Sequence, residues 1–97
     1  MQVPQSESLD RLMEVIANLN TKEECRLFFD DLCTIKELLD MAQRLDVAVL
    51  LKDGVNYQTI SQQVNVSTAT ISRVSRCLNY GNGGYTVALG KIAEEKA

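Results

Sequence analysis

The side chains best suited to contact another molecule lie within a run of nine residues, from Thr68 to Arg76. They are small, hydroxyl-bearing or cationic, without a carboxylate: Thr68, Ala69, Ser72, Arg73 and Arg76. On a helix this spacing places all five on one side, called here the outer face. Short side chains let a helix approach base edges, while hydroxyl and guanidinium groups donate hydrogen bonds to bases and phosphates. The outer face therefore predicts contact with double-stranded DNA.

A helix-turn-helix over residues 56–78 is the element that would present this face. Asn56 can cap a first helix, in which Ile60 and Val64 lie four residues apart on one side. Asn65 suits the corner, because asparagine tolerates the left-handed backbone conformation that such a corner uses. The alternative is a pair of ordinary core helices with a polar outer side.

The second helix of this motif would begin after Ser67, whose hydroxyl can cap it. Its inward side is apolar at helical spacing: Ile71, Val74 and Leu78. At the corner, Val66 is expected to be buried. At the start of the first helix, Tyr57 and Gln58 are placed to contact the DNA backbone beside the groove.

Charge is unevenly distributed along the 97 residues, whose net charge is -3. Residues 1–53 carry 11 acidic and 6 basic side chains, whereas residues 54–93 contain no Asp or Glu and include Arg73, Arg76 and Lys91. Because salt screens exposed charges beyond about 8 to 10 Å, the local positive field decides binding to DNA phosphates. Three cations per chain predict weak binding by one copy and useful affinity only for two.

Enzymatic, metal-binding and membrane functions find little support in the composition. The sequence has no histidine, no phosphate-binding glycine loop and no nucleophile beside a base, so we predict neither catalytic nor metal residues and no cofactor. Cys25, Cys33 and Cys77 lack metal-ligand spacing and are expected to be reduced and half-buried. With no signal peptide and no stretch of 18 apolar residues, a soluble cytoplasmic protein that makes no membrane contact is expected.

Residues 8–53 are expected to form three dimerisation helices. Capping boxes begin the second and third of these at Thr21 and Thr34, each with a glutamate three residues later. The third runs from Ile35 to about Lys52, ends at Gly54, and is apolar on more than one side. A helix with so little polar surface must be covered by other helices on nearly all sides. This favours a homodimer over burial of the helix within a monomer.

The C-terminal part is expected to contain a loop over residues 79–85, rich in glycine and asparagine, and a short helix over residues 86–96. Residues 1–5 precede the helical pattern and are expected to form a frayed arm. The sequence thus predicts one all-α domain over residues 1–97 with about six helices.

Two stretches, TIKELLDMAQRLDVAVLL and STATISRVSRCLNYGNGGY, resemble the tryptophan repressor superfamily, and within it the TrpR-like proteins of the YerC/YecD type. The similarity extends over about residues 32–85. It implies an intertwined homodimer that presents two helix-turn-helix motifs to successive major grooves of an operator, about 34 Å apart.

The resemblance also places Arg44 and Arg73 where two arginines hold tryptophan in the better-known repressor. In that pattern a glycine follows the second arginine and leaves room for the indole, whereas this sequence has Val74. A branched side chain there argues against tryptophan as corepressor, and the sequence identifies no other small-molecule effector. Arg44 has an alternative role as the ion-pair partner of Asp40 or Asp46.

The leading function is transcription regulation by a sequence-specific DNA-binding protein, a probable repressor acting as a homodimer on a palindromic operator. One alternative is a protein-interaction or assembly module that retains the fold without binding DNA, which the overall acidity favours. Another is the DNA-binding subunit of a transposase-like system, with catalysis on a separate chain. An enzyme is the least favoured class.

Overall fold

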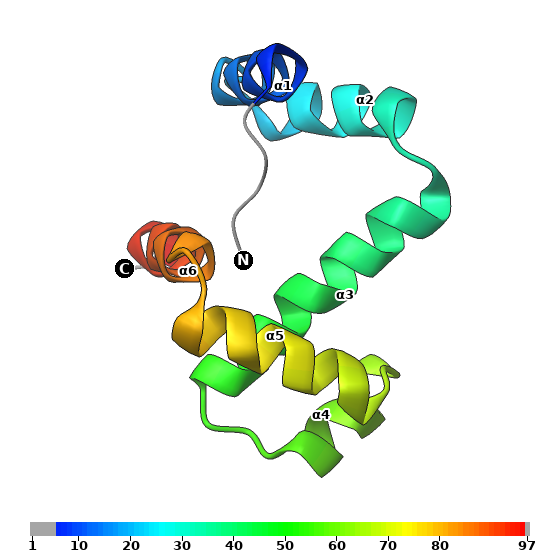
Figure 1. Cartoon of the computed structure of the whole chain (residues 1–97), viewed down its shortest axis with the longest axis vertical. Helices are drawn as coiled ribbons and strands as arrows, with labels where there is room; N and C mark the ends of the chain where they lie inside the picture. The colour runs from blue at the N-terminus through cyan, green and yellow to red at the C-terminus, as the bar shows by residue number, and fades with distance from the viewer. Residues whose placement is uncertain (1–5, 97) are drawn as a thin grey trace. The chain divides into compact units, whose positions relative to one another are not determined.

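The computed structural model describes residues 6–96, and every regular element in that range is an α-helix (Figure 1). The arm predicted for residues 1–5 lies outside the residues that the structure describes. In chain order the helices are α1 (Glu7–Ala17), α2 (Lys22–Leu32), α3 (Ile35–Lys52), α4 (Tyr57–Val64), α5 (Thr68–Tyr80) and α6 (Gly84–Lys96). The predicted all-α fold class with about six helices is confirmed.

The chain divides into two compact units, one extending to Leu38 and the other starting at Leu39. The division falls inside α3, so most of this helix belongs with α4, α5 and α6. The C-terminal part of α3 groups with the helix-turn-helix, because Val47 and Ala48 of α3 share its core. That residues 8–53 act as dimerisation helices stays a prediction.

Local hydrogen bonds set the starts of the helices in the first unit. Ser6 caps α1 by accepting from the Leu9 N–H at 3.0 Å. At α2, the Thr21 hydroxyl accepts from the Glu24 N–H at 3.0 Å, and the Glu24 carboxylate accepts from the Asn20 N–H at 2.8 Å. Neither α1 nor α2 contains a buried residue. Two short helices that bury no residue are stable only when other helices pack against their apolar sides.

Helix α3 begins and ends as the sequence predicts. The Glu37 N–H donates to the Thr34 hydroxyl at 3.1 Å, and the Thr34 N–H donates to the Glu37 carboxylate at 2.8 Å. At the other end, Gly54 has φ +82°, and the Val55 N–H reaches back to the Leu50 carbonyl at 3.0 Å. This glycine-dependent turn satisfies the last carbonyls of the helix.

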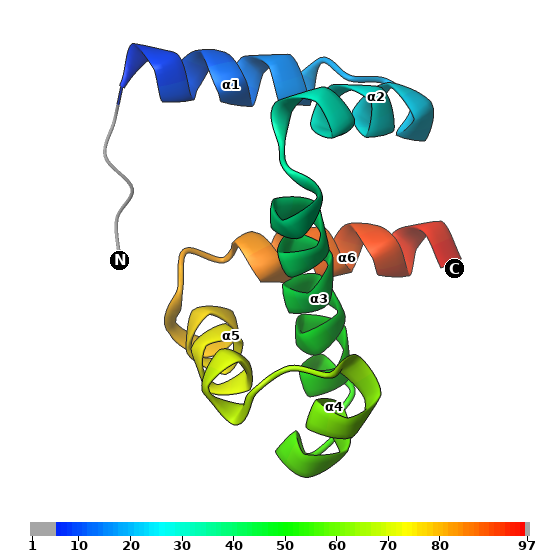
Figure 2. The same cartoon turned by 90° about the vertical axis from the view of Figure 1, so that its right-hand side faces the viewer.

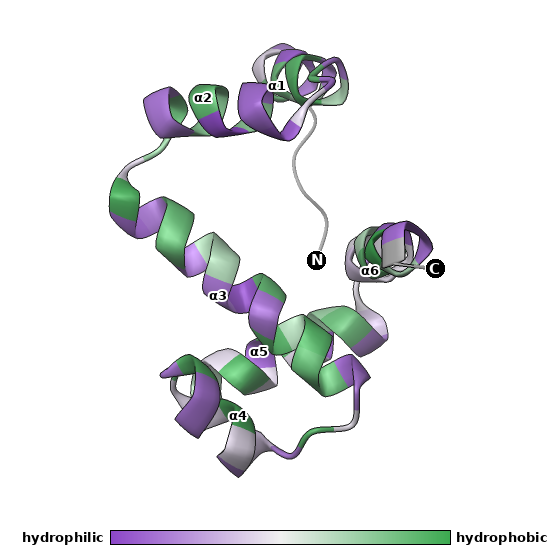
Figure 3. Cartoon of the chain, turned by 180° about the vertical axis from the view of Figure 1, so that it is seen from behind, coloured by the Kyte–Doolittle hydropathy of each residue, from purple (hydrophilic) through white to green (hydrophobic). Residues whose placement is uncertain are grey.

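Apolar and polar residues alternate along α3 (Figure 3). Val47 and Ala48 are fully buried, while Leu39, Met41 and Leu45 remain 58%, 37% and 37% exposed. The helix is therefore covered on one side only in a single chain.

The core of the second unit draws on all four of its helices. Its buried members are Val47, Ala48, Ile60, Ile71, Val74 and Leu89. Figure 2 shows α4 and α5 meeting at their corner beside the C-terminal part of α3, with α6 following a short turn. The buried apolar side chains hold the helix-turn-helix against α3 and α6.

The loop expected over residues 79–85 is shorter in the structure. Helix α5 continues to Tyr80, and the Gly81 N–H bonds to the Cys77 carbonyl at 2.9 Å. Gly83, with φ +87°, turns the chain into α6, which begins at Gly84 and not at Thr86. Composition predicted an irregular run, but glycine tolerates helix ends well, so only residues 81–83 are irregular.

Candidate nucleic-acid interface

The corner between α4 and α5 is held by local hydrogen bonds. The Asn56 side chain caps α4 by accepting from the Thr59 N–H at 2.9 Å. Asn65 has φ 60° and ψ 50°, the expected left-handed conformation, and its N–H bonds to the Ser61 carbonyl at 3.1 Å. The Ser61 hydroxyl donates to the Val66 carbonyl at 2.8 Å. These bonds set the direction in which α5 leaves the corner, and Val66 is half-buried instead of fully buried.

Helix α5 has one buried side. Ser67 caps it by accepting from the Thr70 N–H at 3.2 Å, and the two hydroxyl oxygens also lie 3.2 Å apart. Ile71 is fully buried and Val74 is 2% exposed, so both pack into the core, and Leu78 is half-buried. Burial of this side determines which residues of α5 face solvent.

All five residues of the outer face of α5 are exposed: Thr68, Ala69, Ser72, Arg73 and Arg76. On α4, Gln58 is exposed and Tyr57 is 38% exposed. The α5 outer face and the start of α4 are therefore open to a partner.

The first turns of α4 and α5 add to the positive charge that Arg73 and Arg76 bring to this surface. Helices α1, α2 and α3 each have acidic residues in the first turn, whereas α4 and α5 have none. The positive ends of the α4 and α5 dipoles are thus not neutralised by a carboxylate in their own first turns. Free backbone N–H groups at such ends favour anions, including phosphates.

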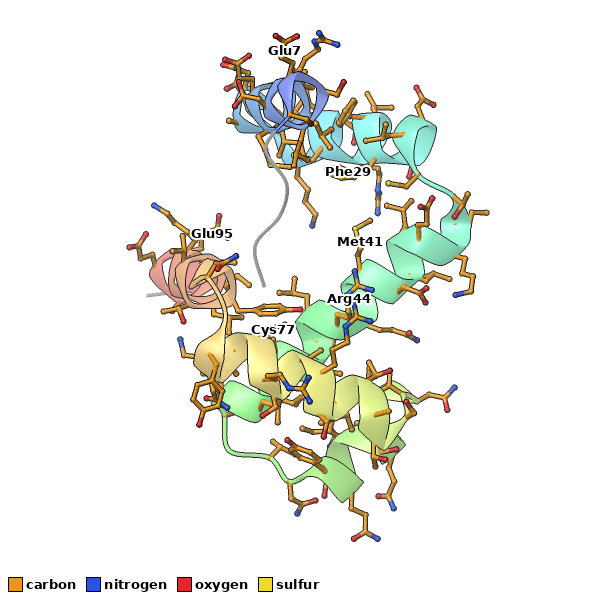
Figure 4. All side chains as sticks on the ribbon, in the orientation of Figure 1. Glu7, Phe29, Met41, Arg44, Cys77 and Glu95 are labelled. Atoms are coloured by element: carbon orange, nitrogen blue, oxygen red, sulfur yellow. The ribbon has the colours of Figure 1, made fainter. Side chains whose placement is uncertain are left out.

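Arg44 and Arg73 belong to different helices. Arg44 projects from α3, where it is half-buried, and Arg73 is exposed on α5. Figure 4 labels Arg44 on α3 and Cys77 on α5. Cys77 is exposed, contrary to our expectation of a half-buried thiol. Val74 directs its side chain into the core, so space that a glycine would leave open at this position is filled.

Two grooves of the second unit contain neither Arg44 nor Arg73 in their walls. One is lined by Leu51, Lys52, Leu78, Asn79, Thr86 and Leu89, and the other by Leu45, Asp46, Val49, Leu50, Gln63, Val64 and Ile92. We did not predict either groove. Each draws residues from three elements, and no local spacing pattern reveals such a combination.

A protein-family model described as Trp repressor protein matches residues 7–93 of the chain. The chain belongs to the Trp repressor family. This family member is similar to the uncharacterized protein YerC of Bacillus subtilis (strain 168), with 54% identity over 86 residues. The alignment covers 89% of this chain and 83% of YerC. The resemblance to TrpR-like proteins of the YerC type is confirmed.

Solved structures support the same assignment. A candidate Trp repressor from Staphylococcus aureus shares 47% identity and gives a TM-score of 0.87, covering 92% of this chain and 89% of its own. A TrpR-like protein from Eubacterium eligens ATCC 27750 shares 39% identity with a TM-score of 0.88, covering 92% of each chain. The Trp repressor fold is therefore shown at the level of sequence and of structure.

Membrane-spanning helices and metal sites are both absent from the described residues. Between residues 6 and 96, no helix is both long and apolar enough to cross a membrane. In the same range, no group of three or more cysteine, aspartate or glutamate side chains is arranged to hold a metal ion.

Proposed function

We propose that this Trp repressor family member is a sequence-specific DNA-binding transcription regulator, acting as a repressor by occupying a palindromic operator as a homodimer. The observation that carries the proposal is the outer face of α5. It is exposed and free of carboxylates, and the buried Ile71 and Val74 on the opposite side of the helix hold it in a fixed orientation.

Each residue of the interface has a role that follows from its chemistry. Thr68, Ala69 and Ser72 are short enough to meet base edges in the major groove. Arg73 and Arg76 contact phosphates or guanine. Tyr57 and Gln58, at the start of α4, contact the backbone beside the groove. Phosphate contacts fix the register on DNA, and base contacts supply sequence preference.

A second copy is part of the proposal for two reasons. Helices α1 and α2 bury no residue, and α3 leaves Leu39 58% exposed, so one chain has apolar surface to cover. One helix-turn-helix also supplies few cations. Two motifs on one homodimer double the phosphate contacts and match a palindromic site.

We further propose that tryptophan is not required for DNA binding. Val74 is 2% exposed and packs with Ile60 and Ile71, so its side chain fills the position that must stay open for an indole beside Arg73. The helix-turn-helix is already held by this packing. Added tryptophan should leave the DNA affinity unchanged.

The experiment is selection of random duplex DNA on the purified protein, followed by gel shifts on the enriched site. Arg73→Ala and Arg76→Ala should each weaken binding to all sequences and lower the salt-dependence slope by about 0.9 for each phosphate that the variant no longer neutralises. Arg11→Ala, an exposed arginine on α1, is the control and should change neither quantity.

Failure to enrich any site, or unchanged binding by both arginine variants, would remove the assignment. The protein-interaction module would then be the better-supported function, since the whole chain carries a net charge of -3. Enrichment of a single half-site would support DNA binding but contradict a homodimer bound to a palindrome.

A further inference from the structure

The connection between α5 and α6 contains an asparagine that is followed directly by glycine. Residues 81–83 separate Tyr80, the last residue of α5, from Gly84, the first of α6. Asn82 and Gly83 are both exposed. Gly83 has φ +87°, and no atom beyond the adjoining residues lies within 4 Å of the position that a Cβ would take there. The backbone nitrogen of Gly83 therefore follows an exposed side-chain amide and is not crowded by other side chains.

We propose that Asn82 is a site of spontaneous deamidation, in which the chain itself supplies the attacking group and water is the only other reactant. The Gly83 nitrogen attacks the Asn82 side-chain carbonyl carbon, which forms a C–N bond and closes a five-membered succinimide ring. The side-chain nitrogen leaves as ammonia and takes up the proton lost by the Gly83 N–H. One water molecule then hydrolyses either C–N bond of the ring, giving aspartate or isoaspartate. No electrons are transferred, so no oxidant or reductant is required.

The residue that follows distinguishes Asn82 from the other five asparagines of the chain. Glycine has no side chain, so its backbone can approach a neighbouring group closely. A Cβ narrows the backbone conformations that are open to a residue, and ring closure needs the nitrogen to turn toward the asparagine side chain. The other five asparagines are all followed by larger residues: Leu19, Thr21, Tyr57, Val66 and Tyr80.

Asp53 also precedes a glycine, and two features make it a slower site for ring closure. Its carboxylate is negatively charged, which opposes attack on its carbon atom. The Gly54 N–H donates to the Leu51 carbonyl at 3.0 Å, within the turn that ends α3. Attack by this nitrogen would break that hydrogen bond. Asp53 therefore serves as an internal comparison for isoaspartate formation in the same chain.

Either product of the reaction changes the start of α6. Residues 54–93 contain no Asp or Glu, so the new carboxylate is the first in this part of the chain. The first turn of α6 has no acidic residue, and a negative charge beside it is favourable for the helix dipole. Isoaspartate instead adds one carbon atom to the main chain between α5 and α6. Because Leu89 of α6 is 5% exposed and belongs to the core, isoaspartate should loosen the packing of α6.

Ageing of the purified full-length protein tests the site. The protein is kept in mildly alkaline buffer, digested, and analysed by tandem mass spectrometry, which locates a mass change within a peptide. We expect Asn82 to gain the mass difference between an amide and a carboxylic acid, in two products that separate by chromatography. Asn79, which lies within α5 and precedes Tyr80, is the matched control and should react at least tenfold more slowly. Asn82→Gln keeps an amide but would need a larger ring, so it should remove the mass change.

Three results would overturn the proposal. One is an unchanged mass at Asn82 under conditions in which a free peptide of residues 79–86 deamidates. Another is a faster change at Asn79 or at any other asparagine. The third is aspartate without isoaspartate, which indicates direct hydrolysis of the amide with no succinimide.

The effect on α6 is measured by circular dichroism melts of the separated products. The isoaspartate form should melt at a lower temperature than Asn82→Asp, which carries the same charge on a normal main chain. Equal melting temperatures would contradict the loosening of α6. None of these measurements involves DNA, so the modification site can fail while the regulator assignment stands.

Discussion

Arg73 and Val74 are neighbours in sequence and have opposite environments. Arg73 is exposed on the outer face of α5, whereas Val74 is 2% exposed and belongs to the core. Successive residues of a helix point about 100° apart, so one residue can lie on the exposed outer face while the next packs into the core. Substituting Val74 should disturb the position of Arg73 without removing any of the proposed DNA contacts.

Glu37 provides a test of the capping box at α3. The Thr34 N–H, and after it the Thr34 hydroxyl, hold the pKa of the Glu37 carboxyl below its usual 4.5. A lowered pKa in the folded state means that the stabilisation is complete above pH 4.5 and is lost as the pH falls through the folded pKa. Thr34→Ala should raise the pKa of Glu37 toward 4.5, measured by carbon NMR titration.

Thr34→Ser is the control, because it retains the hydroxyl. It should leave the pKa of Glu37 low, and equal titrations for the alanine and serine variants would contradict a role for the hydroxyl. Glu37→Gln should remove the dependence of folding stability on pH that this side chain contributes.

The helix-turn-helix depends on one left-handed residue between its two helices. Asn65→Ala should lower the free energy of unfolding by about 1 to 2 kcal/mol, because a Cβ without a local hydrogen-bonding group is unfavourable at φ 60°. Asn65→Gly should retain the corner and stability close to that of the unmodified protein. Urea unfolding at one fixed protein concentration measures both.

The alanine variant should also bind DNA less well, because the direction of α5 is set at this corner. A stable alanine variant with unchanged operator affinity would show that the left-handed turn is not needed to present α5.

At the scale of the whole molecule, the two units differ in how much they bury. The six buried apolar residues of the described chain all lie beyond Leu38, and neither α1 nor α2 contributes one. A chain with this distribution gains stability when a second copy covers its exposed apolar helices.

The proposed homodimer therefore predicts a melting temperature that rises with protein concentration. Each tenfold increase should stabilise the folded dimer by about 1.4 kcal/mol. Circular dichroism melts over a hundredfold concentration range, with sedimentation to report the mass, measure this. A melting temperature independent of concentration would exclude an obligate dimer.

Many features of the fold are determined by residues close together in the sequence. Asn56, Ser67 and the two threonine capping boxes begin four of the helices, and Gly54 and Asn65 end two of them, because a cap acts within one turn of the chain. The helical spacing of Ile71 and Val74 likewise determined which side of α5 faces solvent.

Other features depend on residues far apart in sequence. The division inside α3 follows from the packing of Val47 and Ala48 with α4, α5 and α6. The groove beside α4 joins Leu45, Gln63 and Ile92. The sequence by itself determined the helices and the outer face, since helical hydrogen bonds span four residues. Only the tertiary structure decided which helices share a core and where a groove forms, because burial depends on contacts between distant segments.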